Sequence, residues 1–148
     1  MKELSTKRPV CASFYCYTCV HSLDHLHVRR GHFEYGRTLA QAFAKLSPRP
    51  TAFVAVNDET AVGAQLEFQA LGLRVPEDLS VVGFNNQNFC QMVRPQLTSV
   101  DQQIEPTVRA AAEIVLAALS RPLPRTPPLC LIEPVLVVRG STGRVAKR

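Results

Sequence analysis

The sequence predicts an α/β fold, with a parallel sheet flanked by helices, from three observations. Residues 51–56 (TAFVAV) form a short apolar run, as expected for a strand that is buried on both faces, and residues 79–84 (LSVVGF) form a second short apolar strand. The residues between them repeat apolar side chains with the period of a helix. A strand, a helix and a second strand form a βαβ unit, so the two strands should be parallel and joined by a right-handed crossover.

A first helix is expected over residues 33–46, before the βαβ unit. Residues 47–50 (SPRP) should end it, because proline cannot continue a helix and disfavours helical geometry in the residue before it. The apolar face of this helix should consist of Phe33, Leu39, Ala42, Phe43 and Leu46.

The helix of the βαβ unit is expected to start at Asp58 and to end before Gly72. Asp58 is a good N-cap residue, and Glu59 places a second carboxylate at the positive end of the helix dipole. Gly72 stands where a left-handed residue closes a helix, and Leu73 can make the accompanying apolar contact. The buried face should consist of Ala61, Ala64, Phe68 and Leu71.

A third helix is expected from Glu105 or Pro106 to about Leu119, because proline is accepted in a first turn. Its buried stripe should consist of Val108, Ala111, Ala112, Val115 and Leu119. Residues 121–128 form a proline-rich connector. Residues 129–139 read as one or two strands interrupted at Pro134, which suits an edge strand or a bulge. Residues 140–148 are expected to form a frayed tail.

Residues 1–30 form a separate N-terminal segment of uncertain structure, because they show neither a strand nor a helix period. Histidines follow Cys16 and Cys19 there, and both residue types bind zinc. However, the first of them, His21, comes only two positions after Cys19, whereas a zinc finger leaves about 12 residues for a hairpin and a helix. An unrelated or disordered leader is the favoured interpretation, and no metal site is assigned.

The net charge of +5 does not by itself indicate nucleic-acid binding. Residues 1–30 carry five basic and two acidic residues, and residues 121–148 carry six and one. Residues 31–120 carry six basic and nine acidic residues. Positive charge is therefore concentrated in the terminal segments rather than on one face of the folded part, and we interpret it as a contribution to solubility.

A cytoplasmic location is predicted. No apolar run approaches the roughly 20 residues of a membrane helix, so no membrane association is expected. The first residues imitate a signal peptide only loosely, because polar residues dilute the apolar stretch and no A-x-A-like cleavage site follows. The five cysteines are an odd number, which fits a reducing compartment better than a disulfide framework.

Polar residues follow both predicted parallel strands. Asn57 and Asp58 follow the first, and residues 85–88 (NNQN) follow the second. Ligands of open parallel sheets bind beyond the carboxyl ends of the strands, and carboxamides suit a neutral, hydroxyl-rich ligand such as a sugar. For Asp58 the capping role is favoured. For Asn57 and Asn85 a ligand contact and a role in a turn remain equally open.

Longer stretches resemble the lactose/galactose-repressor family of bacterial transcriptional regulators. The resemblance rests on residues 50–86, which end in LGLRVPEDLSVVGFNN, on RPQLTSVDQ at 94–102 and on EPVLVVRGSTG at 133–143. It implies a fold like that of type I periplasmic binding proteins, with residues 31–148 as a partial effector-binding domain. This part is mainly the C-terminal subdomain, and the N-terminal subdomain is missing. In the family, an effector bound between the subdomains changes the affinity of a helix-turn-helix for DNA.

The resemblance implies three effector contacts. Asn57 matches an asparagine that contacts the effector, Asn85 matches a residue that is usually an aspartate bonded to sugar hydroxyls, and Phe33 stands where an aromatic ring can stack on the sugar. An asparagine at 85 replaces a charge-assisted acceptor by a neutral amide, which weakens or redirects recognition. The helix at 59–71 and the loop at 90–94 match the family's homodimer interface, with contacts expected from Val62, Gln65, Leu66, Met92 and Val93.

The resemblance therefore predicts the sugar-sensing and dimerisation portion of a regulator, truncated and without a helix-turn-helix, that needs no cofactor. An enzyme is not expected, because no H-E-x-x-H, G-x-S-x-G or similar catalytic pattern occurs. Two alternatives stay open: a fragment of a periplasmic sugar receptor of a transport system, and a gene remnant without activity. The helix at 106–119 normally packs on the missing subdomain, so its apolar face should be exposed or repacked.

Overall fold

The computed structural model describes residues 32–120 and 129–144. The segment 1–30 and its cysteines and histidines lie outside these residues. The predicted helices and the two predicted strands of the βαβ unit are confirmed as elements. In chain order, the elements are α1 (His32–Ala44), β1 (Ala52–Val54), α2 (Asp58–Ala70), β2 (Ser80–Phe84), the 3-10 helix η2 (Asn88–Gln91), β3 (Thr98–Asp101), α3 (Ile104–Ser120) and β4 (Val135–Val137).

The four strands form one sheet in the order β1-β2-β3-β4. β1 pairs with β2 in parallel, so the predicted parallel βαβ unit is confirmed. β2 also pairs in parallel with β3, and β4 pairs antiparallel with β3. The sequence does not predict β3, and of the expected strand region 129–139 only β4 forms a strand.

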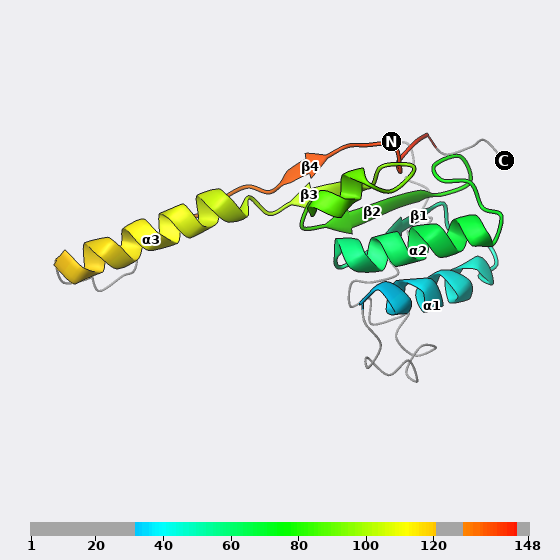
Figure 1. Ribbon diagram of the computed structural model, residues 1–148, viewed down its shortest axis with the longest axis horizontal. Helices are drawn as coiled ribbons and strands as arrows, with labels where there is room; N and C mark the ends of the chain where they lie inside the picture. The colour runs from blue at the N-terminus through cyan, green and yellow to red at the C-terminus, as the bar shows by residue number, and fades with distance from the viewer. Residues whose placement is uncertain (1–31, 121–128, 145–148) are drawn as a thin grey trace, which may run out of the picture.

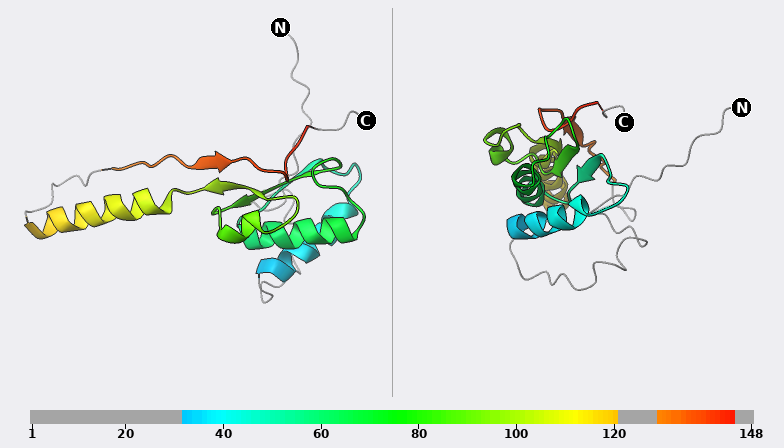
Figure 2. Two further views of the ribbon diagram at one scale, coloured as in Figure 1. Left: turned by 45° about the horizontal axis from the view of Figure 1, so that its top comes forward. Right: turned by 90° about the vertical axis from the view of Figure 1, so that its right-hand side faces the viewer.

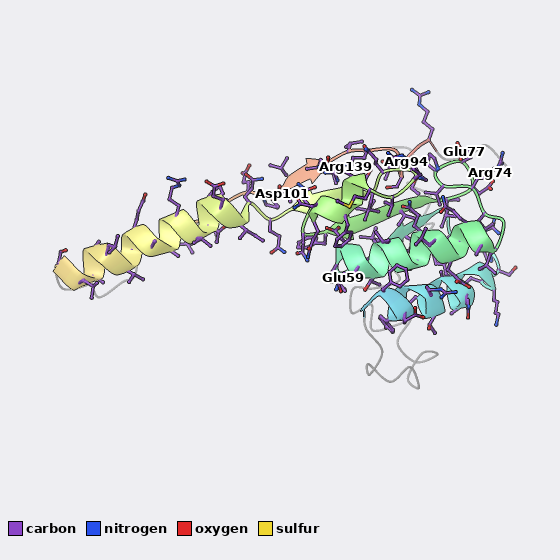
Figure 3. All side chains as sticks on the ribbon, viewed as in Figure 1. Glu59, Arg74, Glu77, Arg94, Asp101 and Arg139 are labelled. Atoms are coloured by element: carbon purple, nitrogen blue, oxygen red, sulfur yellow. The ribbon has the colours of Figure 1, made fainter. Side chains whose placement is uncertain are left out.

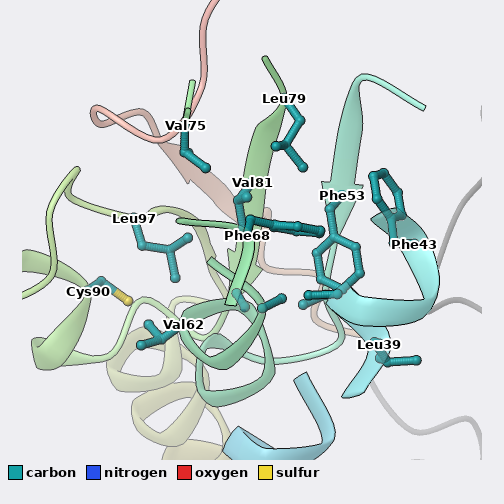
Figure 4. Close-up of a cluster of buried hydrophobic side chains, with 14 residues drawn as sticks. Leu39, Phe43, Phe53, Val62, Phe68, Val75, Leu79, Val81, Cys90 and Leu97 are labelled. Atoms are coloured by element: carbon teal, nitrogen blue, oxygen red, sulfur yellow. The ribbon is translucent and has the colours of Figure 1, made fainter. Parts of the chain in front are cut away.

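The hydrophobic core lies between the sheet and the helices α1 and α2, which cover the same face of the sheet (Figure 1, Figure 2). Phe43 of α1, Phe53 of β1 and Phe68 of α2 meet edge to face, with ring centroids 5.3 to 5.7 Å apart. Figure 4 shows this aromatic cluster next to Val81 of β2. In β1, Ala52 is exposed and Phe53 is buried, so the prediction of a first strand buried on both faces is wrong.

Two glycines let the backbones of α1 and α2 touch. A Cβ atom at Gly63 would lie 2.0 Å from the carbonyl oxygen of Phe33, and one at Gly36 would lie 2.1 Å from the carbonyl oxygen of Thr60. Both distances are far shorter than a van der Waals contact, so a larger residue forces the helices apart. The glycines therefore set how closely α1, and with it Phe33, approaches the first half of α2.

Asn57, and not Asp58, caps α2, which corrects the sequence prediction. The side-chain oxygen of Asn57 accepts a hydrogen bond of 2.8 Å from the backbone N–H of Thr60. Asp58 is the first residue of the helix, and its side chain is buried. At the other end Gly72 has a φ of 79° and Leu73 packs against the core, as predicted.

Three apolar residues at the predicted ends of elements are exposed, because the elements stop short of them. α1, β1 and α2 end at Ala44, Val54 and Ala70. The exposed residues beyond these ends are Leu46, Val56 and Leu71.

α3 begins just beyond β3 and projects away from the sheet and the other two helices (Figure 1, Figure 2). None of its 17 residues is buried, so the prediction of a buried stripe is wrong. Val115 and Leu119, both in that stripe, are 59% and 80% exposed. The apolar face is thus exposed, which is one of the two outcomes that the resemblance implies. Among the described helices, none has the length and apolar character to span a membrane.

The chain returns from β4 to lie against β2 and β3. Ser141 is fully buried there. Its hydroxyl donates a hydrogen bond of 2.6 Å to the carbonyl oxygen of Val81 and accepts one of 2.8 Å from the backbone N–H of Thr98. The first residues of the segment 140–148 are therefore anchored to the sheet, and the prediction of a frayed tail is wrong for them.

Candidate functional site

The carboxyl ends of β1, β2 and β3 lie at one edge of the sheet, because these three strands are parallel. Asn57 follows β1, Asn85 follows β2 and Asp101 ends β3. In Figure 3, Asp101 and Glu59 mark this edge, whereas Arg74 lies toward the opposite end. The structure therefore brings the two predicted asparagines to the same edge, from which α3 also starts.

Asn57 caps α2 with the oxygen of its carboxamide. Its oxygen accepts the hydrogen bond from Thr60, while its amide nitrogen donates none within residues 32–120 and 129–144. The residue is half-buried. The capping role is thus observed, and the amide nitrogen is left for an acceptor such as a hydroxyl oxygen. The effector contact stays a prediction.

Asn85 starts the loop after β2 with a φ of 106°. Its backbone N–H donates a hydrogen bond of 2.8 Å to the carbonyl oxygen of Val100. Its side-chain oxygen accepts a hydrogen bond from the side-chain amide of Gln102, which lies between β3 and α3. Positive φ is uncommon outside glycine and concentrates at binding sites, where the surrounding structure holds it in place.

Asn86 lies at the centre of a polar group with Asp101 and Arg139. Its side-chain nitrogen donates to Oδ2 of Asp101 at 2.9 Å, and its side-chain oxygen accepts from Nη2 of Arg139 at 2.6 Å. Oδ1 of Asp101 accepts from the backbone N–H of Gln103 at 2.7 Å. The hydrogen bond from Asn86, followed by that from Gln103, lowers the pKa of Asp101. Its charged form is therefore favoured.

A second polar group joins the start of α2 to the same loop. The buried carboxylate of Asp58 accepts hydrogen bonds from the hydroxyl of Ser99 at 2.6 Å and from the backbone N–H of Gln87 at 2.7 Å. The Ser99 hydroxyl in turn accepts from the backbone N–H of Asn86 at 3.0 Å. Burial, and then the Asp58 carboxylate, raise the pKa of Cys90 to about 12, so its thiol stays protonated.

The carboxamides at this edge offer hydrogen bonding to a neutral ligand. The side chains of Asn57, Asn85 and Gln102 are carboxamides, which both donate and accept. Within the part of the chain that the structure describes, no group of three His, Cys, Asp or Glu residues is placed to hold a metal ion. The edge is thus equipped to orient hydroxyl groups.

Phe33, the predicted stacking residue, lies in the first turn of α1 and is 38% exposed. Its backbone carbonyl faces α2 at Gly63, six residues after the cap at Asn57. The aromatic ring therefore belongs to a helix that packs beside the start of α2. Stacking of this ring on a sugar stays a prediction.

The residues of the predicted dimer interface divide into two groups. Val62 and Gln65 are buried inside the chain, and the Gln65 side chain donates to the carbonyl oxygen of Pro95 at 2.7 Å. Because both side chains are buried, we remove Val62 and Gln65 from the residues that can contact a partner. Leu66 and Met92 are exposed, by 41% and 76%. The remaining candidate is Val93, which is half-buried and packs against the core.

Sequence reasoning missed the residues that hold the loop after β2. Ser99 and Asp101 lie on β3, and recognition of that strand would have placed them at the carboxyl edge with the asparagines. Asn86 lies in the polar run 85–88, in which nothing distinguishes it from its neighbours. For Arg139, which reaches Asn86 from 53 residues away, the local sequence carries no signal.

Comparisons with known proteins bear on this arrangement. Residues 17–142 match the model of the periplasmic binding protein-like domain. The HTH-type transcriptional repressor PurR of Vibrio vulnificus (strain CMCP6) is 31% identical over 126 residues, which cover 84% of this chain and 37% of the repressor.

Two solved structures are similar as well. A regulatory protein of LacI family from Chloroflexus aggregans has a TM-score of 0.69 and 31% identity, over 86% of this chain and 48% of its own. A LacI family transcriptional regulator from Arthrobacter sp. FB24, in complex with lactose, has a TM-score of 0.67 and 30% identity, over 75% of this chain and 41% of its own. The chain thus spans less than half the length of each of these relatives.

Proposed function

The chain belongs to the family of periplasmic binding protein-like domains, and on this premise we propose that it is the effector-sensing and self-associating portion of a bacterial transcriptional regulator. Its effector is a sugar or a sugar derivative. The relatives that support the proposal are transcriptional regulators, and one of them was solved with lactose. Because such a regulator acts where the DNA is, the proposal includes a cytoplasmic location.

The observation that carries the proposal is the pair of carboxamides at the carboxyl edge of the sheet. Asn57 still has its amide donor after capping α2. The side-chain oxygen of Asn85 accepts one hydrogen bond, from Gln102, and has a second lone pair for a ligand. A sugar hydroxyl can accept from the first and donate to the second. Each neutral hydrogen bond contributes about 0.5–1.5 kcal/mol, so two such contacts orient a sugar and need further contacts for tight binding.

Isothermal titration calorimetry of the 148-residue chain with lactose, glucose, galactose and ribose tests this function. The informative variant is Asn57→Ser, because serine also caps helices well but has no amide donor. We expect the variant to keep the melting temperature of the wild type and to bind the preferred sugar more weakly. Wild-type protein that binds none of these sugars would refute the sugar effector, and equal binding by the variant would remove Asn57 from the site.

Self-association is the second part of the proposal. Leu66 on α2 and Met92 after η2 are large apolar side chains on the surface. Gln69 donates to the carbonyl oxygen of Arg94 at 2.8 Å, and Gln65 donates to that of the next residue. The loop is therefore held against α2, and we assign Leu66 and Met92 to one homodimer surface.

A further inference from the structure

Three segments that are far apart in the sequence meet at Asn86. Asn86 follows β2, Asp101 ends β3 and Arg139 follows β4. Both ends of the Asn86 carboxamide are engaged within the chain, the nitrogen by Asp101 and the oxygen by Arg139. The neighbouring Asn85, in contrast, has one side-chain hydrogen bond within the described residues, which it accepts from the exposed Gln102.

The partners of Asn86 are themselves fixed. Arg139 donates a second hydrogen bond, of 2.7 Å, to the carbonyl oxygen of Leu97, the residue before β3. Asp101 accepts from the backbone N–H of Gln103, which has a φ of 56° and immediately precedes α3. Two consecutive hydrogen bonds thus connect the loop after β2 to the residue from which α3 starts.

We propose that Asn86 is a positioning residue of the effector site, which it connects to the start of α3 through Asp101 and anchors to the sheet through Arg139. This inference rests on the proposed function, because Asn86 is proposed to orient Asn85, the residue that contacts the effector. Asn85 and Asn86 have φ values of 106° and 52°, and their backbone N–H groups donate to Val100 and Ser99 of β3, so hydrogen bonds to β3 hold the loop in this conformation. A ligand that engages Asn85 then acts on Gln103 through the same loop.

The hydrogen-bond pattern permits a test in which two side chains are exchanged. Asn86→Asp alone sets two carboxylates against each other where Asn86 donated to Asp101. Asp101→Asn alone replaces one of two acceptor oxygens by an amide, so either Asn86 or Gln103 loses its acceptor. Each single variant therefore removes one hydrogen bond from the polar group formed by Asn86, Asp101 and Arg139.

The double variant Asn86→Asp/Asp101→Asn restores every bond. The carboxylate at position 86 accepts from Arg139 and from the new amide at 101, whose oxygen accepts from Gln103. Total charge is that of the wild type. Asparagine and aspartate both tolerate positive φ, so the backbone cost at position 86 is similar in all the variants.

The first measurement is amide hydrogen exchange of the ligand-free chain by NMR, at Asn86 and Gln103, with Val81 in the core as the reference. We expect each single variant to speed exchange at both sites by about tenfold, as for the loss of one hydrogen bond to a charged group. Val81 should not change, and the double variant should return both sites to the wild-type rates. A general loss of stability would speed Val81 as well, and this result would overturn the proposal.

The second measurement is the affinity for the sugar that the wild type binds best. The single variants should lose about tenfold in affinity and the double variant should recover it. Unchanged affinity in the single variants, or a double variant that shows the sum of both losses, would contradict the positioning role. A wild-type chain that binds no sugar overturns the proposed function, and the exchange rates then still decide whether Asn86 links the two segments.

Discussion

The hydroxyl of Ser99 donates a hydrogen bond of 2.6 Å to the carboxylate of Asp58, and both side chains are fully buried. The bond joins the first residue of α2 to the middle of β3, 41 positions further along the chain. Because the carboxylate has no access to water, its hydrogen bonds and its place at the N-terminus of α2 compensate for its burial. The geometry at the carboxyl edge of the sheet depends on this contact.

Ser99→Ala should lower the free energy of unfolding by about 2 kcal/mol, because it removes a hydrogen bond to a buried charged group. Urea denaturation measures this loss. Ser120→Ala, at the exposed end of α3, is the control and should change the free energy by less than about 0.5 kcal/mol. Equal effects of the two substitutions would mean that the Asp58 carboxylate finds another donor.

Gly63→Ala should destabilise the fold by about 1–3 kcal/mol, although alanine favours helices over glycine by about 1 kcal/mol. The added methyl group would lie 2.0 Å from the carbonyl oxygen of Phe33. Ala70→Gly, at an exposed position of the same helix, measures the propensity effect alone. Stabilisation by Gly63→Ala in thermal or urea unfolding would show that α1 and α2 can separate without cost.

The stability that Asp78 contributes to the chain should be lost as the pH falls below 3.8. Hydrogen bonds from the Arg74 side chain, and then from its backbone N–H, lower the pKa of Asp78 from 3.8 to about 2. A carboxylate with a lower pKa in the folded state contributes stability above its unfolded pKa and loses it as the pH falls through the folded pKa. Between pH 3.8 and about 2, the melting temperature of Asp78→Asn should therefore fall less than that of the wild type.

The control for Asp78 is Glu77→Gln, which removes one negative charge from the neighbouring exposed residue. Its melting temperature should follow that of the wild type through the same pH range. A constant difference between Asp78→Asn and the wild type would contradict the assignment to the Arg74 pair.

Asn85→Asp should strengthen the binding of a neutral sugar. Aspartate keeps the acceptor for Gln102, tolerates positive φ and adds charge to the contact with a hydroxyl. The gain should be about 0.5–2 kcal/mol, up to about thirtyfold in affinity. Calorimetry across the sugar panel measures it, and Asn88→Asp, at the exposed first residue of η2, controls for charge alone. Weaker binding of every sugar would show that position 85 must donate.

Met92→Glu should weaken self-association by at least about tenfold, because it places a charge on the proposed apolar dimer surface. Leu66→Glu should have the same effect. Leu46→Glu, at a similarly exposed position beyond α1, is the control and should leave association unchanged. Sedimentation equilibrium distinguishes these outcomes, and a wild-type chain that is monomeric at about 50 µM would contradict the homodimer.

The sequence predicted the βαβ unit because its buried residues are apolar and regularly spaced. It did not predict β3, whose buried residues Thr98 and Ser99 are polar. Their hydroxyls can be buried because distant partners satisfy them: the backbone N–H of Arg139 donates to the hydroxyl of Thr98, and the hydroxyl of Ser99 donates to Asp58. Hydrophobic periodicity cannot reveal a strand whose burial depends on hydrogen bonds between residues more than 40 positions apart.

The hydrogen bond between Ser99 and Asp58 also explains why the predicted N-cap of α2 was wrong. Asn57 and Asp58 are both good capping residues, and spacing cannot choose between neighbours. The side chain of Asp58 accepts a hydrogen bond from Ser99, and the side chain of Asn57 caps the helix instead. For α3 the sequence showed which face is apolar, but periodicity carries no information on whether another element covers that face.

α3 has consequences for the cooperativity of unfolding. None of its residues is buried, so its helical structure gains little from the core and depends on intrinsic propensity and on local pairs such as Arg109 with Glu105. Isolated helices of about this length are marginal in water and melt gradually. The ellipticity of α3 should therefore decline over a wide temperature range, while the rest of the chain melts in one transition. Calorimetric and van't Hoff enthalpies should accordingly disagree, because α3 unfolds outside the cooperative unit.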